Sequence, residues 1–196
     1  VLRQKIARLS QEAERKTATA RRAGFYIKRE GAGQVMLVGL ANTGKSQLLA
    51  AVTEAIPEIA EYPFTTKTLI PGMMKFEDVQ IQLVDTPPIG YKEVKVLLSN
   101  VLRNADLIAI VIDLSREPVS QVESTLQWLR EARIEPLTDD GTQATPGSYP
   151  RRMLIVGNKN ELAGSHNNWE RLRSQYAHIF PVISVPAKEG RRREEF

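Results

Sequence analysis

The stretch Gly39-Leu40-Ala41-Asn42-Thr43-Gly44-Lys45-Ser46 determines how the rest of this sequence is interpreted. It matches the pattern G-x-x-x-x-G-K-[ST], in which a glycine-rich turn wraps its backbone N–H groups around the phosphates of a nucleotide. That pattern requires a strand before it and a helix after it. Residues 34–40 form a short apolar run, and residues 44–55 have a helical pattern that stops at Pro57. Both neighbours are therefore expected, which disfavours an accidental glycine-rich turn.

This loop suggests a role for each of its polar groups. The Lys45 ammonium is expected to reach the β- and γ-phosphates, and the Ser46 hydroxyl is expected to bind Mg²⁺. Main-chain N–H groups at the start of the following helix stabilise the negative charge of the phosphates. The positions expected to contact the nucleotide phosphates are Gly39, Ala41, Asn42, Thr43, Gly44, Lys45, Ser46 and Gln47.

Strand-like and helix-like patterns alternate along the rest of the chain. Apolar runs predict strands at residues 68–76, 79–84, 107–112, 153–156 and 182–185. Periodic apolar residues predict helices at residues 93–103, 119–129 and 169–176. Residues 138–150 are rich in Asp, Gly, Thr and Pro and predict a surface loop. This alternation is typical of an α/β fold with a mainly parallel sheet flanked by helices. No complete helix follows the last strand, so we expect the natural chain to continue beyond Phe196.

Positive charge is concentrated at the start of the chain. Residues 1–33 carry nine Lys or Arg and three Glu, although the whole chain of 196 residues has a net charge of only +4. Apolar residues at helical spacing predict an amphipathic helix over residues 2–22. We therefore divide the chain into a basic helical arm, residues 1–33, and a nucleotide-binding domain, residues 34–196. A basic arm favours an anionic partner such as RNA, and a solvated helix face is an equally good interpretation.

The composition excludes several classes of protein. The absence of cysteine rules out disulfides and thiolate metal sites, and it fits a reducing compartment such as the cytoplasm. The longest apolar run, residues 107–112, is far shorter than the ~20 residues that a membrane-spanning helix needs. We therefore expect a cytoplasmic protein with no membrane span.

Two stretches after the loop complete the expected metal site. Asp85 ends the apolar run 81–84, and a carboxylate at this place is expected to hold Mg²⁺ directly or through water. A threonine in the segment 62–66 is placed to close over the γ-phosphate and the metal when a triphosphate is bound. An ordinary turn residue and a solvent loop are the alternative interpretations of these two stretches.

A further stretch, Asn158-Lys159-Asn160-Glu161, predicts the base-binding part of the site. The Glu161 carboxylate can accept hydrogen bonds from both N1–H and the exocyclic amine of guanine, a pair that adenine does not offer. Ser184 and Val185 end the last strand and are expected to contribute to the same pocket. Asp113 also follows a predicted strand, but it is more typical of a cap or turn residue than of a ligand.

In this order, the stretches resemble the G boxes of a translation-factor-class GTPase, and in detail the Obg/DRG branch of developmentally regulated GTP-binding proteins. Residues 39–46, residues 62–66 and the preceding basic helix carry this resemblance, which covers essentially the whole chain. It implies a P-loop NTPase of the Ras-like G-domain fold, GTP hydrolysis to GDP with Mg²⁺, a regulatory switch, and association with ribosomes or RNA. It also implies that Thr66 senses the metal and that a C-terminal TGS domain is lacking here.

Two departures from the family pattern affect the expected hydrolysis. The third box reads Asp85-Thr86-Pro87-Pro88, so a proline without N–H replaces the glycine that usually contacts the γ-phosphate. The next residue, Ile89, cannot orient a water molecule. We therefore expect slow intrinsic turnover. Related GTPases hold K⁺ with an asparagine at the position of Asn42, and we hypothesise that K⁺ there replaces an arginine finger, with Lys45 and Thr66 completing the catalytic group.

A third departure concerns the base. The fourth box ends in Glu161 rather than the usual aspartate, as in an ATP-preferring Obg-like branch, whereas Lys159 favours guanine. GTP is the expected nucleotide. The alternatives are an Obg-like ATPase and a nucleotide-dependent module that binds RNA or protein with negligible hydrolysis. A metabolic P-loop kinase is disfavoured by Asn158-Lys159.

Overall fold

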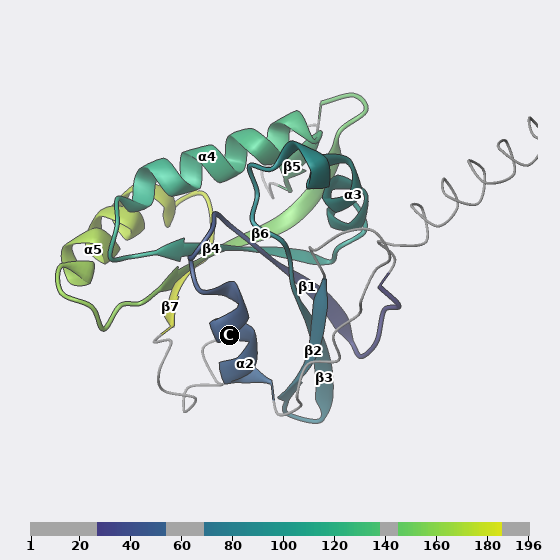
Figure 1. Ribbon diagram of the computed structural model, residues 1–196, viewed down its shortest axis with the longest axis horizontal. Coiled ribbons are helices and arrows are strands. Elements are labelled where there is room, and N and C mark those ends of the chain that lie inside the picture. Colours follow the sequence, from purple (N-terminus) through teal and green to yellow (C-terminus); the bar gives the residue numbers. More distant parts are fainter. Residues whose placement is uncertain (1–26, 54–68, 138–144, 186–196) are drawn as a thin grey trace, which may run out of the picture.

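A sheet with helices on both faces organises residues 27–53, 69–137 and 145–185, the part of the chain that the computed structural model describes (Figure 1). The predicted arm helix and the segment 62–66, which includes Thr66, lie outside these ranges. The strands are β1 (Gly33–Val38), β2 (Ile70–Phe76), β3 (Val79–Asp85), β4 (Leu107–Asp113), β5 (Ile134–Pro136), β6 (Tyr149–Asn158) and β7 (Val182–Val185). The helices are α2 (Lys45–Val52), α3 (Lys92–Leu102), α4 (Pro118–Glu131) and α5 (Ser165–Tyr176).

The sheet has the strand order β2-β3-β1-β4-β6-β5, and β7 pairs with the carboxyl half of β6. Every strand pairing is parallel except the antiparallel pair β2–β3, which confirms the predicted α/β fold with its mainly parallel sheet. Because β1, β3, β4 and β6 run in the same direction, their carboxyl ends meet along one edge. Open parallel sheets bind ligands at this edge.

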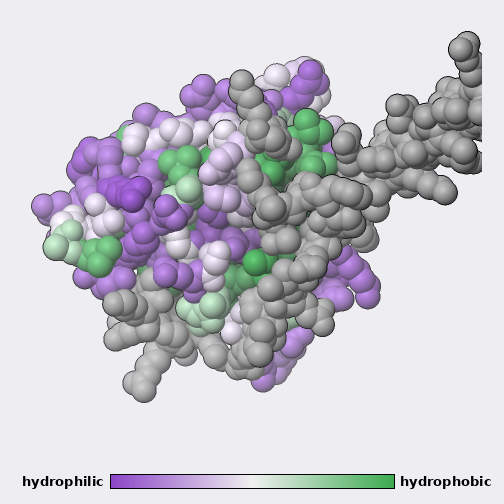
Figure 2. Space-filling model, viewed as in Figure 1, coloured by the Kyte–Doolittle hydropathy of each residue, from purple (hydrophilic) through white to green (hydrophobic). Residues whose placement is uncertain are grey.

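Both faces of the central strands are buried. Along β1, Val35 and Leu37 pack in the core that α2 covers, whereas Met36 and Val38 pack in the core that α3, α4 and α5 cover. This alternation follows from the two-residue period of a strand, and it explains why the central strands are apolar throughout. Hydrophilic side chains dominate the outer surface of α4 and α5, as expected for helices with one buried stripe (Figure 2). Within the described ranges, no helix is long and apolar enough to cross a membrane.

The structure corrects some predicted elements. β2 confirms the predicted strand across Pro71, which an edge strand tolerates without its N–H, so the corrections concern β5, β6 and α5. β6 begins at Tyr149, inside the stretch predicted to be a loop. Its first three residues pair with β5, a strand that was not predicted. The first four residues of β6 are exposed or half-buried, so hydrophobic patterning gives no signal there. α5 begins at Ser165, four residues earlier than predicted.

Candidate functional site

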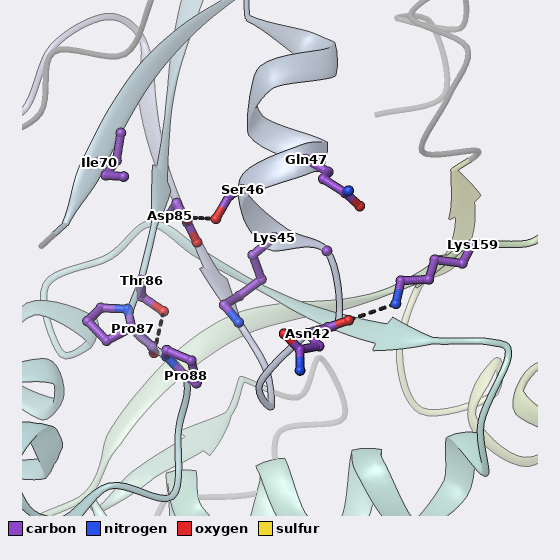
Figure 3. A pocket seen from close by; sticks show the side chains of 11 residues that line it. Asn42, Lys45, Ser46, Gln47, Ile70, Asp85, Thr86, Pro87, Pro88 and Lys159 are labelled. Atoms are coloured by element: carbon purple, nitrogen blue, oxygen red, sulfur yellow. Dashed lines mark hydrogen bonds between the residues drawn. The ribbon is translucent and has the colours of Figure 1, made fainter. Parts of the chain in front are cut away.

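A cavity of about 640 Å³ opens at the carboxyl edge of the sheet, where β1 turns into α2 (Figure 3). Its walls come from the predicted phosphate-binding loop, the start of α2, the first residue of β2, the end of β3 with the three residues that follow, and the residue after β6. The lining residues are Asn42, Gly44, Lys45, Ser46, Gln47, Ile70, Asp85, Thr86, Pro87, Pro88 and Lys159. Stretches far apart in sequence are therefore brought to one site.

The loop depends on two glycines for its shape. Gly44 has φ +89°, and a Cβ atom there would lie 2.2 Å from Asn158 Nδ2. A Cβ atom on Gly39 would lie 2.5 Å from the Val111 carbonyl oxygen of β4. Glycine is favoured at Gly39 because a side chain would overlap the backbone of β4, and at Gly44 because the positive φ strains other residues and an added Cβ would meet the Asn158 side chain. The spacing of the two glycines in the motif thus has a steric reason in this chain.

Lys45 is a buried cation, and its hydrogen-bond partners among the described residues are two carbonyl groups. Its Nζ donates to the Leu40 oxygen at 2.9 Å and to the Gly39 oxygen at 3.3 Å, both within its own loop. The side chain is 5% exposed, and burial lowers the pKa of Lys45, partly offset by the nearby Asp85 charge. An anion entering the cavity would compensate this desolvated ammonium better than neutral carbonyls do.

Ser46 and Asp85 form the second polar group of the cavity. The Ser46 hydroxyl donates to Asp85 Oδ2, and Asp85 Oδ1 is buried without a hydrogen-bond partner among the described residues. Burial raises the pKa of Asp85, against the smaller opposing effects of Ser46, Lys45 and Thr86. A hydroxyl and a carboxylate are the hard oxygen ligands that Mg²⁺ prefers, so these two residues fit that ion. Among the described residues, no group of three or more His, Cys, Asp or Glu could hold a metal alone.

The residues after β3 line the cavity and are also fixed by contacts with β1 and the core. The Thr86 hydroxyl donates to the Leu37 oxygen at 2.7 Å, and the Ile89 N–H donates to the Gly39 oxygen at 3.2 Å. The Ile89 side chain is 5% exposed and belongs to the core beneath α3 and α4. Its position is therefore used for packing, while Pro88 faces the cavity without an N–H to offer.

At the other end of the cavity, β6 is tied to the loop. Asn158 Nδ2 donates to the Thr43 oxygen at 2.9 Å, while its buried Oδ1 has no partner in the part of the chain that the structure describes. The Lys159 ammonium donates to the Asn42 oxygen at 2.8 Å and to Asp113 Oδ2 at 2.6 Å. These contacts join the ends of β1, β4 and β6. Asp113 is thus part of the candidate site, although the sequence analysis interpreted it as a cap or turn residue. Its position directly after an apolar run, like that of Asp85, was the feature of the sequence that could have indicated a place in the site.

The remaining predicted base-binding residues lie near this end of the site but do not line the cavity. Ser184 and Val185 lie beside Gly157 and Asn158 in the β6–β7 register, and Asn160 Nδ2 donates to the Ser184 hydroxyl at 2.7 Å. Glu161 is exposed in the turn after β6. Its pairing with a base stays a prediction.

Several solved structures have a similar fold. The G domain of the T. maritima FeoB iron transporter superposes with a TM-score of 0.60 at 20% identity, covering 81% of this chain and 91% of that one. The cytosolic domain of the same transporter in its GMPPNP form gives a TM-score of 0.57 at 20% identity, covering 81% and 59%. At this identity the likeness establishes the fold alone, which is that of a G domain.

Sequence relatives are closer. Developmentally-regulated G-protein 1 of Arabidopsis thaliana is 38% identical over 59% of this chain and 31% of its own length. Developmentally-regulated GTP-binding protein 2 of Homo sapiens is 33% identical over 54% and 30%. An uncharacterized GTP-binding protein of Caenorhabditis elegans is 28% identical over 94% and 51%. The chain thus spans about a third to a half of the length of these relatives.

A family profile decides the assignment. The profile described as "50S ribosome-binding GTPase" matches residues 34–139, which is more than half of the chain and contains the loop, Ser46 and Asp85. Its relatives are developmentally regulated GTP-binding proteins of the DRG/Obg group. The chain therefore belongs to the 50S ribosome-binding GTPase family.

Proposed function

We propose that this chain binds GTP with Mg²⁺ and hydrolyses it slowly to GDP and phosphate, as a regulatory switch linked to the ribosome. One observation carries the proposal: within the part of the chain that the structure describes, the cavity contains a buried ammonium bound to two carbonyls and, near it, a buried carboxylate oxygen without a hydrogen-bond partner. A nucleotide's phosphates and a divalent cation are the pair of ligands that would compensate both charges at once. Family membership supports the same reading.

In this proposal, the phosphates bind at the loop. The Lys45 ammonium leaves its own loop carbonyls for the β- and γ-phosphates, and the N–H groups at the start of α2 point at them. Ser46 and Asp85 would hold Mg²⁺, which neutralises negative charge on the phosphate oxygens. Thr66, outside the described residues, is proposed to complete the metal site when a triphosphate is bound.

For the base, we assign Asn158, Lys159 and Glu161, with Ser184 and Val185 beside them. Guanine is favoured because a carboxylate can accept both of its edge N–H groups. Glu161 is one methylene longer than the usual aspartate, which keeps an ATP-preferring protein as the alternative. Competition of GTP and ATP for one labelled nucleotide distinguishes the two, since tighter ATP binding would reverse the assignment.

Slow hydrolysis follows from the residues after β3. Pro88 has no N–H for a γ-phosphate, and the Ile89 side chain is directed into the core. We propose that Asn42, on the exposed side of the loop with φ +64°, holds K⁺ in place of an arginine finger. Single-turnover hydrolysis measured in KCl and in NaCl tests this role, and equal rates would exclude it.

Pro88 and Ile89 also favour a second candidate function, a nucleotide-dependent module that binds RNA or protein with negligible hydrolysis. Phosphate release in a single-turnover assay separates the candidates, because the module predicts none above the rate in buffer. The shared premise is tested by calorimetry with GDP and GTP in the presence of Mg²⁺. Absence of heat from both nucleotides would refute both candidates.

The ribosome link is proposed through the basic arm, residues 1–33, with RNA phosphates as the contact. Binding of this kind weakens steeply with salt, by a slope that reflects the number of phosphates contacted. Charge reversal at Arg21 and Arg22 is expected to reduce that slope by about 2 if both residues contact phosphates. An unchanged slope would remove these two arginines from the interface.

A further inference from the structure

Asp113, the last residue of β4, is shared between two neighbours. Its Oδ1 accepts from the Ser115 N–H at 2.9 Å and from the Ser115 hydroxyl at 2.6 Å, which is the expected turn-capping role. Its Oδ2 accepts from the Lys159 ammonium at 2.6 Å. The Asp113 side chain is only 3% exposed, while Arg116 lies farther away, at 3.8 Å, and is largely exposed. A turn cap alone does not require the second oxygen to face β6.

Lys159 is anchored at two points as a result. Its ammonium contacts Asp113 and the Asn42 oxygen of the loop, while its stem lines the cavity (Figure 3). Its backbone has φ +61°, a conformation that L side chains adopt at a cost. A lysine stem normally samples many rotamers, so two anchors remove most of its freedom before any ligand arrives.

Burial and charge indicate that the Asp113–Lys159 ion pair is persistent. Burial alone would raise the pKa of Asp113, but the hydrogen bonds from Lys159 and Ser115 reverse this and lower it. The carboxylate is therefore ionised near neutral pH and keeps its partner. No other carboxylate is in ion-pair contact with Lys159 among the residues that the structure describes.

We infer that Asp113 is a positioning residue for the nucleotide: it holds Lys159 against the loop so that the lysine stem forms a fixed wall for the base and sugar. The inference rests on the proposed nucleotide binding. It separates the ligand into two parts, because the phosphates bind at Lys45 and the loop amides, whereas the nucleoside part lies where Lys159 meets the end of β6. Loss of Asp113 should weaken the second part only.

Calorimetry on the full chain with GDP and with inorganic tripolyphosphate tests this separation. Asp113→Asn keeps an oxygen for Ser115 but offers no charge to Lys159, and it is expected to weaken GDP binding about 10-fold or more. Tripolyphosphate binding is expected to stay within about 2-fold of wild type. Ser115→Ala, which removes a contact on the other carboxylate oxygen, is the matched control and should leave both affinities unchanged.

A double-mutant cycle shows whether Asp113 acts through Lys159. Asp113→Asn should cost GDP affinity in the wild type but nothing further in a Lys159→Met background, because the residue it positions is already gone. Additive losses would overturn the inference, as would equal losses for GDP and tripolyphosphate. If Asp113→Asn does not fold, Asp113→Ser replaces it, and failure of both to fold would assign Asp113 to stability alone. A wild type that binds no GDP would instead refute the proposed function.

Discussion

The two parts of the candidate site are built in different ways. The phosphate half, which comprises the loop 39–46 with Lys45, Ser46 and Asp85, is made by one local turn and one neighbouring strand. Lys45 and Asp85 are buried, and the exposed Ser46 donates its hydroxyl to Asp85. The base half, which comprises residues 158–161 with Ser184 and Val185, depends on the ends of β6 and β7, and its predicted carboxylate at Glu161 is exposed.

Because of this difference, we expect the phosphate half to determine the affinity for nucleotides in general and the base half to determine which base is preferred. The phosphate half contains the buried charges of Lys45 and Asp85, which phosphates and Mg²⁺ would compensate. It should therefore contribute affinity for any nucleotide with Mg²⁺. The base half is tied to the loop through Asn158 and Lys159, and its contribution depends on how those ties place the lysine stem and Glu161. Substitutions in the two halves should therefore have different signatures.

The largest effect is expected from Lys45→Ala in the phosphate half. Loss of the buried ammonium should weaken GDP, GTP and tripolyphosphate alike by about 100-fold, because charge-assisted hydrogen bonds to phosphate disappear. Calorimetry measures this, and single-turnover phosphate release should become undetectable. Lys95→Ala removes a half-buried lysine that pairs with Glu131 of α4, outside the site; it is the control and should bind like wild type. Retention of GDP binding in the Lys45 variant would contradict the division into halves.

Gly44 lies where the halves meet, and its substitution tests that contact. Gly44→Ala and Gly164→Ala both place a Cβ at positive φ, +89° and +83°, but only the former also meets Asn158, at 2.2 Å. Left-handed strain alone costs about 1–2 kcal/mol of unfolding free energy, and the overlap is expected to add about 1–3 kcal/mol more.

Urea unfolding of both glycine variants measures the difference. Gly164→Ala should lose stability but keep its nucleotide affinity, since nothing lies within 4 Å of its added Cβ. Gly44→Ala should lose both. Equal losses of stability in the two variants would mean that the loop is not held against β6 as closely as the structure indicates.

Asp85→Asn should separate metal binding from stability within the phosphate half. The folded protein raises the pKa of Asp85 above its ordinary value of 3.8, mainly through burial. Because the pKa is raised in the folded protein, the free energy of unfolding is greatest while Asp85 is protonated and decreases as the pH rises through the folded-state pKa. At pH 7 the ionised carboxylate therefore destabilises the ligand-free protein, and asparagine removes this cost.

The ligand-free Asp85→Asn variant should melt about 2–4 °C higher than wild type at pH 7, the shift that about 1 kcal/mol produces at this size. The gain should shrink as the pH falls toward 4. The Mg²⁺-dependent part of nucleotide affinity should be lost, so that adding chelator changes the binding of wild type but not of the variant. A lower melting temperature at pH 7 would show that the buried carboxylate is better compensated than its unpartnered Oδ1 indicates.

The smallest effect is expected from Glu161→Asp in the base half. The shorter side chain should raise the preference for GTP over ATP by about 3–10-fold, which a change of one methylene in a contact can produce. Competition binding measures the ratio. Glu170→Asp, at an exposed position of α5, is the control. An unchanged ratio would show that Glu161 does not reach the base, and a lower one would show that the longer acid fits guanine better.

Local patterns in the sequence accounted for the sheet and for the phosphate half. The glycine and lysine spacing of residues 39–46 is a contiguous signal, and apolar runs of fixed period mark the strands that bury both faces. β5 and the start of β6 escaped prediction because edge segments with polar, half-buried residues lack such a period. The place of Asp85 in the candidate site could be predicted because this residue directly follows an apolar run that predicts a buried strand.

What the sequence determined by itself is therefore the order of elements, the loop and the residues that carry its charges, since these depend on neighbours in the chain. Only the tertiary structure decided that Ile89 packs in the core, that Asp85 keeps an unpartnered oxygen, and that Asp113 meets Lys159. The physical reason is that hydrogen bonding and burial at the edge of a parallel sheet depend on which strand ends lie side by side. That adjacency follows from strand order and register, which residues 46 positions apart cannot reveal by their spacing.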